Sequence, residues 1–143
     1  MSKALYVHLQ QLTGRYQSLY ELFAKLHQNC QMLADPGRPL SAIKISPLHS
    51  DGYFDVTLAG TTTRFLFEFR PGESGNTKAT VRCLRLEKIS NRMQPIGAFQ
   101  FDGQGDTAMK HPDSCDPVLL SMDSGACYVV AYYVNEALNS KSQ

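Results

Sequence analysis

The sequence contains no hydrophobic run long enough to cross a membrane, and its first residues lack the apolar core that is typical of a signal peptide. A transmembrane helix needs roughly 20 consecutive apolar residues, whereas the most apolar stretch of this chain covers only residues 126–134. Near the N-terminus, His8, Gln10 and Gln11 interrupt the apolar core that a signal peptide requires. We therefore expect a cytoplasmic protein with no membrane contact.

Cysteine pairs at metal-binding or redox spacing are also missing. The four cysteines, Cys30, Cys83, Cys115 and Cys127, lie far apart and form no Cys-x-x-Cys motif. Reduced thiols are the expected state in the cytoplasm.

Motifs that mark catalytic and cofactor sites are absent as well. The chain contains no Gly-x-Ser-x-Gly, Gly-x-x-x-x-Gly-Lys, His-Glu-x-x-His or Gly-x-Gly-x-x-Gly. These absences argue against hydrolases, nucleotide-binding enzymes and metalloproteases that are built on such motifs. We expect no cofactor and no metal, although a site assembled from distant residues would leave no such signature.

The positive and negative charges of the chain nearly balance. The chain has 14 Lys and Arg against 13 Asp and Glu, for a formal net charge of +1, which argues against a polyanion binder driven by overall charge. Its 143 residues are 43% hydrophobic and 19% charged, near the averages of globular proteins. We expect one domain over residues 1–143.

The strongest positive signal is a heptad pattern near the N-terminus. Apolar side chains recur there at steps of four and three: Leu5, Leu9, Leu12, Tyr16, Leu19, Phe23, Leu26, Cys30 and Leu33. This spacing predicts one long helix. Ser2 is a candidate N-cap, and the Asp-Pro-Gly sequence at 35–37 is expected to end the helix.

The predicted helix is too long to be covered by its own domain. From Lys3 to Ala34 it would measure about 48 Å, whereas a compact domain of this size has a diameter somewhat below ~40 Å. Either the helix breaks near Gly14, or it projects and meets a partner. Packing on the chain's own sheet and self-association carry equal weight, and Leu5, Leu12, Leu19 and Leu26 are the candidate partner-binding residues.

Alternating apolar and polar residues predict strands through the middle of the chain. The expected strands cover residues 42–46, 53–59, 63–69, 77–88 and 96–101, with a further candidate at 107–110. Short connections between them leave no room for crossover helices, so the sheet should be an antiparallel meander. Leu84 and Leu86 break the alternation of their strand, which predicts a β-bulge.

The C-terminal part is ambiguous between helix and strand. Residues 102–117 are expected to form a loop. Helical spacing of apolar residues through 118–138 favours a helix with Asp123 as its cap, whereas the β-branched and aromatic run at 128–134 also suits a buried strand.

The expected fold class is α+β. Five or six antiparallel strands should form a sheet, and the N- and C-terminal helices should pack on one face of it. The covered side chains would be Phe54, Val56, Leu58, Phe65, Phe67, Phe69, Val81 and Cys83.

Two local clusters suggest chemistry. Asp102, Asp106, Asp113 and Asp116 supply carboxylates between glycines, as in calcium-binding loops, but the EF-hand spacing fails. His111 and Cys115 are the ingredients of a thiol nucleophile, although Pro112 argues against the helix that would align them. The expected outcome for the whole 102–116 segment is a solvated turn, and a small enzyme with its site there is a minor alternative.

A basic face of the sheet is the third candidate. Arg64, Arg70, Lys78 and Arg82 are expected to share the solvent face of neighbouring strands, and a basic sheet with aromatics can bind single-stranded nucleic acid. The phenylalanines at 65, 67 and 69 fall on the opposite face, which suits a core better than a stacking platform.

The leading functional hypothesis is a non-enzymatic interaction module. The chain would pair with itself as a homodimer, or with another protein, through the long helix or the sheet. A nucleic-acid-binding module is the alternative, and a small enzyme is a further one.

Overall fold

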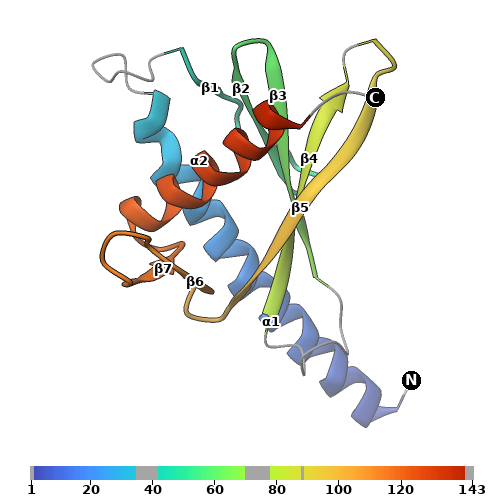
Figure 1. Ribbon diagram of the computed structural model, residues 1–143. Helices are drawn as coiled ribbons and strands as arrows, with labels where there is room; N and C mark the ends of the chain where they lie inside the picture. The colour runs from blue at the N-terminus through green and yellow to red at the C-terminus, as the bar shows by residue number, and fades with distance from the viewer. Residues whose placement is uncertain (1, 35–41, 70–77, 88, 141–143) are drawn as a thin grey trace.

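The computed structural model describes residues 2–34, 42–69, 78–87 and 89–140 (Figure 1). The predicted α+β class is confirmed, with a long N-terminal helix, a five-stranded antiparallel sheet and a C-terminal helix. In chain order the elements are α1 (Lys3–Asn29), the 3-10 helix η1 (Cys30–Ala34), β1 (Lys44–Ile45), β2 (Tyr53–Leu58), β3 (Thr61–Glu68), β4 (Lys78–Glu87), β5 (Arg92–Asp102), β6 (Asp106–Lys110), β7 (Pro117–Leu119) and α2 (Asp123–Asn139).

Helix α1 begins and continues largely as its sequence predicts. The Ser2 hydroxyl accepts a hydrogen bond from the backbone N–H of Leu5 at 3.2 Å, which confirms the N-cap. The helix runs for 27 residues, about 40 Å, and does not break at Gly14. An added Cβ at Gly14 would meet no atom within 4 Å, so this glycine faces open space. The expected stop signal at 35–37 lies outside the described residues.

The sheet has the strand order β1-β2-β3-β4-β5, and every neighbouring pair is antiparallel. The register aligns Phe65 with Phe54 on one side and with Cys83 on the other, so these side chains share one face. The β4–β5 register shifts between Cys83 and Leu84, at the position predicted for a bulge, but the residue left unpaired is Ile96 of β5. Because β4 pairs with β3 without interruption, the bulge lies in the neighbouring strand and does not account for the broken alternation of β4.

One predicted strand belongs to a different sheet. Residues 107–110 were candidates for the end of the meander, but β6 pairs with β7 in a separate two-stranded sheet. The chain turns away from the main sheet at Gly105, whose φ of 80° lies in the left-handed region that glycine adopts readily. A carboxylate oxygen of Asp102 accepts hydrogen bonds from the backbone N–H groups of Gln104 and Asp106 and holds that turn.

The ambiguous C-terminal region forms a helix, which confirms the favoured prediction over the buried strand. Met122 rather than Asp123 occupies the N-cap position, and Asp123 lies in the first turn. The start of α2 packs directly on β7. A Cβ added at Gly125 would lie 2.2 Å from the carbonyl oxygen of Leu119, so only glycine permits this approach.

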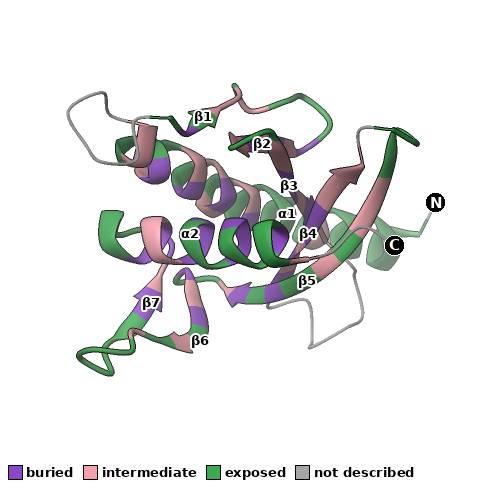
Figure 2. Cartoon of the chain, turned by 45° about the horizontal axis from the view of Figure 1, so that its top comes forward, coloured by how far each residue is buried: buried purple, intermediate pink, exposed green. Residues whose placement is uncertain are grey.

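Both helices contact one face of the sheet (Figures 1 and 2), and the core lies between them and that face. The phenylalanine positions and their neighbours are covered as predicted, because Phe54, Val56, Phe65, Phe67, Val81 and Cys83 are buried while Leu58 and Phe69 are partly buried. Helix α1 contributes Leu19, Phe23 and Leu26, and α2 contributes Val129, Val130 and Tyr133. None of the helices in the described ranges is long and apolar enough to span a membrane.

Candidate interaction surface

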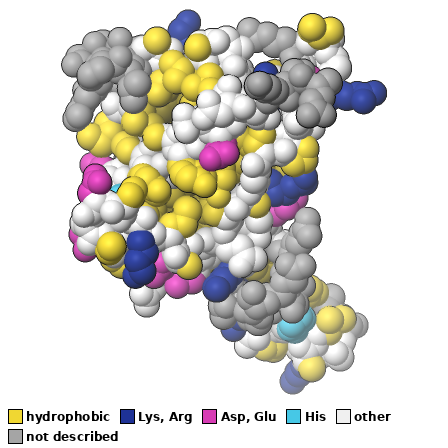
Figure 3. Space-filling view, viewed as in Figure 1, with side chains coloured by type: hydrophobic (Ala, Val, Ile, Leu, Met, Phe, Trp, Pro, Cys, Tyr) yellow, Lys and Arg dark blue, Asp and Glu magenta, His cyan; other side chains and the backbone are white. Residues whose placement is uncertain are grey.

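The apolar stripe of α1 divides into a buried part and an exposed part. Leu19 is 3% exposed and Leu26 is fully buried, so these two candidate partner-binding residues pack in the chain's own core. On the same stripe, Leu5 is 50% exposed, Leu9 45% and Tyr16 43%. Figure 2 shows the buried surface of α1 confined to its C-terminal half, and Figure 3 shows the first turns of the helix standing out from the body.

Tyr16 marks the place where α1 leaves the sheet. Its ring meets Phe67 edge-on at a centroid distance of 5.7 Å and Phe69 at 6.0 Å, and it lies beside Tyr20. Leu12, one turn earlier, is half-buried. We call the set Leu5, Leu9, Leu12 and Tyr16 the free stripe.

Few charges lie on the helix around the free stripe. Between residues 3 and 18 the ionisable side chains of Lys, Arg, His, Asp and Glu type are Lys3, His8 and Arg15. The segment thus offers an apolar surface with slight positive charge and no carboxylate. Such a surface favours contacts driven by apolar burial over contacts specified by ion pairs.

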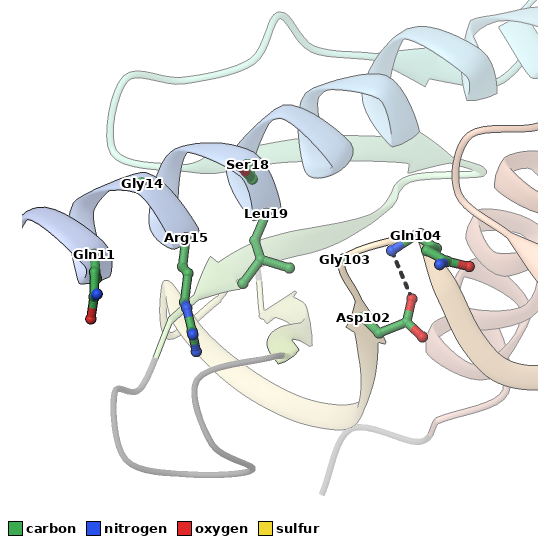
Figure 4. A pocket seen from close by; sticks show the side chains of 8 residues that line it. All are labelled: Gln11, Gly14, Arg15, Ser18, Leu19, Asp102, Gly103 and Gln104. Atoms are coloured by element: carbon green, nitrogen blue, oxygen red, sulfur yellow. Dashed lines mark hydrogen bonds between the residues drawn. The ribbon is translucent and has the colours of Figure 1, made fainter.

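An open hollow of about 780 Å³ lies between α1 and the β5–β6 turn (Figure 4). Five of its eight lining residues have polar side chains; the lining residues are Gln11, Gly14, Arg15, Ser18, Leu19, Asp102, Gly103 and Gln104. The Asp102 carboxylate already accepts two backbone hydrogen bonds of its own turn, at 2.9 and 3.0 Å. The role that the structure shows for this carboxylate is therefore to hold the turn.

The candidate nucleic-acid residues lie beside carboxylates. Arg64 donates two hydrogen bonds to the Asp55 carboxylate, at 2.8 and 3.1 Å, and its guanidinium lies 3.8 Å from the centre of the Tyr53 ring. The hydrogen bond to Asp55 raises the pKa of Arg64 above its usual value. Arg64 is therefore held within the sheet by an ion pair with Asp55 and by a cation–π contact with Tyr53.

The other basic candidates follow the same pattern where they are described. Arg82 lies 3.6 Å from a Glu68 carboxylate oxygen, and exposed Lys78 is aligned with Asp102 in the β4–β5 register. Arg70 lies outside the described residues. Each of the three candidate cations that the structure describes therefore lies beside or is aligned with a carboxylate on the solvent face.

The 102–116 segment uses its polar groups within its own turns. Asp106 accepts a hydrogen bond from the N–H of Ala108 at 2.9 Å. The ring of His111 packs on that of Tyr128, with 5.3 Å between the ring centroids. The backbone carbonyl of His111 accepts a hydrogen bond from the N–H of Cys115, whose side chain is exposed. Within the described part of the chain, no group of three or more His, Cys, Asp or Glu side chains is placed to hold a metal ion.

None of the four cysteines forms a disulfide, and Cys30 and Cys83 are buried. Burial raises the pKa of Cys30 to about 12 and also raises the pKa of Cys83. Thiolates are the nucleophilic form of cysteine, so neither buried thiol is suited to chemistry near neutral pH.

Sequence reasoning missed the role of His27. The heptad pattern places His8 and His27 off the apolar register and predicts both in solvent, but His27 is half-buried. Its Nε2 lies 2.8 Å from the carbonyl oxygen of Ser46, and its ring centroid lies 5.0 Å from that of Phe54. His27 thus ties α1 to the segment after β1, a contact that the local sequence gives no means of finding.

Comparison with family models, with curated proteins and with solved structures finds no match to this chain. Of its candidate features, the ion pairs and the 102–116 turns have partners within the fold. Other large apolar side chains are also exposed among the described residues: Tyr6, Val7, Met32, Ile89, Met122, Tyr132 and Leu138. The free stripe differs from them because it continues a regular helical stripe whose later residues pack in the core.

Proposed function

We propose that this protein is a non-enzymatic interaction module that self-associates through the free stripe of α1. The observation that carries the proposal is the division of one heptad stripe, buried from Leu19 onward and exposed at Leu5, Leu9 and Tyr16. A regular apolar seam on an exposed helix is the surface that pairs with another helix. A second copy supplies the same seam without any further partner.

The association should be weak and depend on concentration. The free stripe supplies four seam residues per chain, each about half exposed or less. Such an interface falls below the roughly 1,200–2,000 Å² that stable complexes bury and belongs with weak, transient contacts. Association also has a cost in translational and rotational freedom of at least about 4 kcal/mol. We therefore expect a monomer–dimer equilibrium that is visible across a protein concentration series.

The main alternative, a nucleic-acid-binding sheet, has less support from the geometry. Arg64 and Arg82 already lie within ion-pair distance of Asp55 and Glu68. A phosphate group would have to compete with these carboxylates for the same guanidinium groups. Such binding would weaken steeply with salt, because it depends on counterion release.

The test is the solution mass by light scattering across a concentration series, for the wild type, Leu9→Asp and Gln10→Asp. Both substitutions add one negative charge to the same exposed turn of α1, but only Leu9 lies on the free stripe. We expect the wild type and Gln10→Asp to dimerise and Leu9→Asp to remain monomeric.

Two outcomes would contradict the proposal. A wild type that stays monomeric at all concentrations removes self-association, and a Leu9→Asp variant that dimerises normally removes α1 as its site. The same series is repeated with a short oligonucleotide at two salt concentrations. A mass increase that needs the oligonucleotide and is lost at high salt would favour the basic sheet face instead.

A further inference from the structure

We infer that the second copy pairs with α1 in the antiparallel direction, with the twofold axis passing between Leu9 and Leu12. This inference rests on the proposed function and specifies its geometry. In such a pair, Leu9 faces Leu12 of the second copy, and Leu5 faces Tyr16 of the second copy.

The spacing of the free stripe is self-complementary in this direction. Its steps from Leu5 are four, three and four, so the sequence of steps is the same when it is followed from Tyr16 backward. Two antiparallel copies of the helix therefore bring every seam residue opposite another seam residue. A twofold arrangement of this kind uses the same patch on both subunits and closes the assembly at two chains.

The folded body decides against the parallel direction. The free stripe continues along α1 into Leu19, Phe23 and Leu26, which the sheet and α2 already cover. A parallel partner in register would bring the same three positions of both copies together, so each partner helix would run into the volume that the other copy's sheet occupies. Side chains buried at 3% exposure or less cannot be shared with a second helix.

The antiparallel register avoids both folded bodies. With Leu5 opposite Tyr16 of the second copy, Lys3 of one copy lies opposite Ser18 of the other. Ser18 is the last residue of α1 before the buried position Leu19. The two helices therefore overlap over residues 3–18 of each copy. The first residue of each helix lies opposite the last residue before the buried part of the other helix.

Charge opposes pairing only weakly and equally in both directions, since Lys3 and Arg15 are positive in both copies. The ionisable groups of the overlapping segment are Lys3, His8 and Arg15, and none of them is a seam residue. Since the segment has no carboxylate, ion pairs across the interface cannot set the direction of pairing. The direction is set by the spacing of the seam and by the position of the two folded bodies.

Disulfide cross-linking distinguishes the two directions. Two variants are made in a background with Cys115→Ser and Cys127→Ala: an untagged Leu5→Cys protein and an affinity-tagged Tyr16→Cys protein. Each variant alone and the mixture of the two are oxidised with copper phenanthroline. Both substituted residues are more than 40% exposed, and thermal unfolding followed by circular dichroism checks that each variant folds. Light scattering on the reduced mixture first establishes that dimers form.

The antiparallel pair predicts an untagged–tagged disulfide in the mixture and little product from Leu5→Cys alone. Residues 5 of the two copies would be offset by about 16 Å along the axis, at ~1.5 Å per residue. We expect at least a tenfold preference for the mixed product.

Each remaining result has a separate meaning. A Leu5→Cys disulfide in the unmixed sample overturns the antiparallel direction and leaves self-association standing. Dimers without any cross-link overturn both the direction and the use of the free stripe. A wild type that stays monomeric by light scattering overturns the proposed function, and the inference with it.

Discussion

Tyr16 and Leu19 lie one helical turn apart on the same stripe of α1, and the limit of the folded body passes between them. Leu19 is 3% exposed and packs in the core, whereas Tyr16 is 43% exposed and its ring touches Phe67 and Phe69 of the sheet. The same apolar pattern therefore serves two purposes. Its C-terminal part holds the fold together, and its N-terminal part forms the surface that we propose for pairing.

This division predicts opposite effects of alanine on the two parts of the stripe. Leu19→Ala should lower the free energy of unfolding by about 2–5 kcal/mol, because it removes buried methyl groups from the core. Leu9→Ala should change it by no more than about 0.5 kcal/mol in the monomer, because Leu9 is already half exposed. Urea unfolding at a concentration where both variants are monomeric measures the difference. Equal effects would mean that the boundary is misplaced.

The contact between α2 and β7 makes a prediction about glycine. Gly125→Ala should destabilise the fold by about 3 kcal/mol, since the added methyl group overlaps the Leu119 backbone, which cannot rotate away. Gly14→Ala is the matched control. It adds the same methyl group to open space on an exposed helix and should stabilise the protein by about 1 kcal/mol. Thermal unfolding of both variants is the measurement, and a neutral Gly125→Ala would contradict the close approach of α2 to β7.

The cysteines predict both a labelling order and a pH dependence. With iodoacetamide at pH 8, exposed Cys115 should react well before buried Cys30 and Cys83, as followed by peptide mass spectrometry. The pKa of Cys30 is raised from 9.0 to about 12 in the folded chain, so the folded state holds this proton more tightly than the unfolded chain does. Its contribution to stability is full below pH 9 and is lost as the pH rises towards 12.

A Cys30→Ala variant is the control for that pH dependence. Its free energy of unfolding should fall less steeply than that of the wild type above pH 9, the ordinary pKa of the thiol. Identical slopes would show that Cys30 does not contribute. A Cys115 that alkylates much faster than a small thiol would instead revive the hypothesis of an enzyme site in the 102–116 segment.

The Arg64–Asp55 pair is expected to stabilise the open face of the sheet modestly. Both side chains are about a quarter exposed, so solvent screening limits the coupling to about 1 kcal/mol despite the two hydrogen bonds. A double-mutant cycle with Arg64→Ala and Asp55→Ala, measured by urea unfolding, gives this value. A coupling near zero would show that the arginine is available to other partners, which the nucleic-acid alternative requires.

Local periodicity predicted much of the fold, because it depends on neighbouring residues alone. The alternation at Phe54, Phe65 and Val81 identified the covered face of the sheet. The broken alternation at Leu84 indicated the position of a bulge but assigned it to β4, whereas the unpaired residue is Ile96 of β5. The Ser2 cap also depends on a contact only three residues away. Helix and strand could be distinguished at 126–134 only by the length of the run.

Contacts between distant residues could not be predicted in this way. Nothing in the sequence near His27 points to Ser46, and nothing near residues 107–110 shows that their strand pairs with β7. The candidate basic face was predicted from alternation alone, which places Arg64 correctly but does not show that Asp55 is its partner. Such pairings depend on which elements become neighbours after folding.

The sequence by itself determined that the chain carries a long apolar stripe on one helix and an apolar face on one sheet, because both are consequences of a repeating local period. It did not determine how far along the helix the sheet would reach. Tertiary packing decided that, since the sheet covers α1 from Leu19 onward and leaves the turns before it exposed. The surface at Leu5, Leu9, Leu12 and Tyr16 exists because the body is shorter than the helix that crosses it.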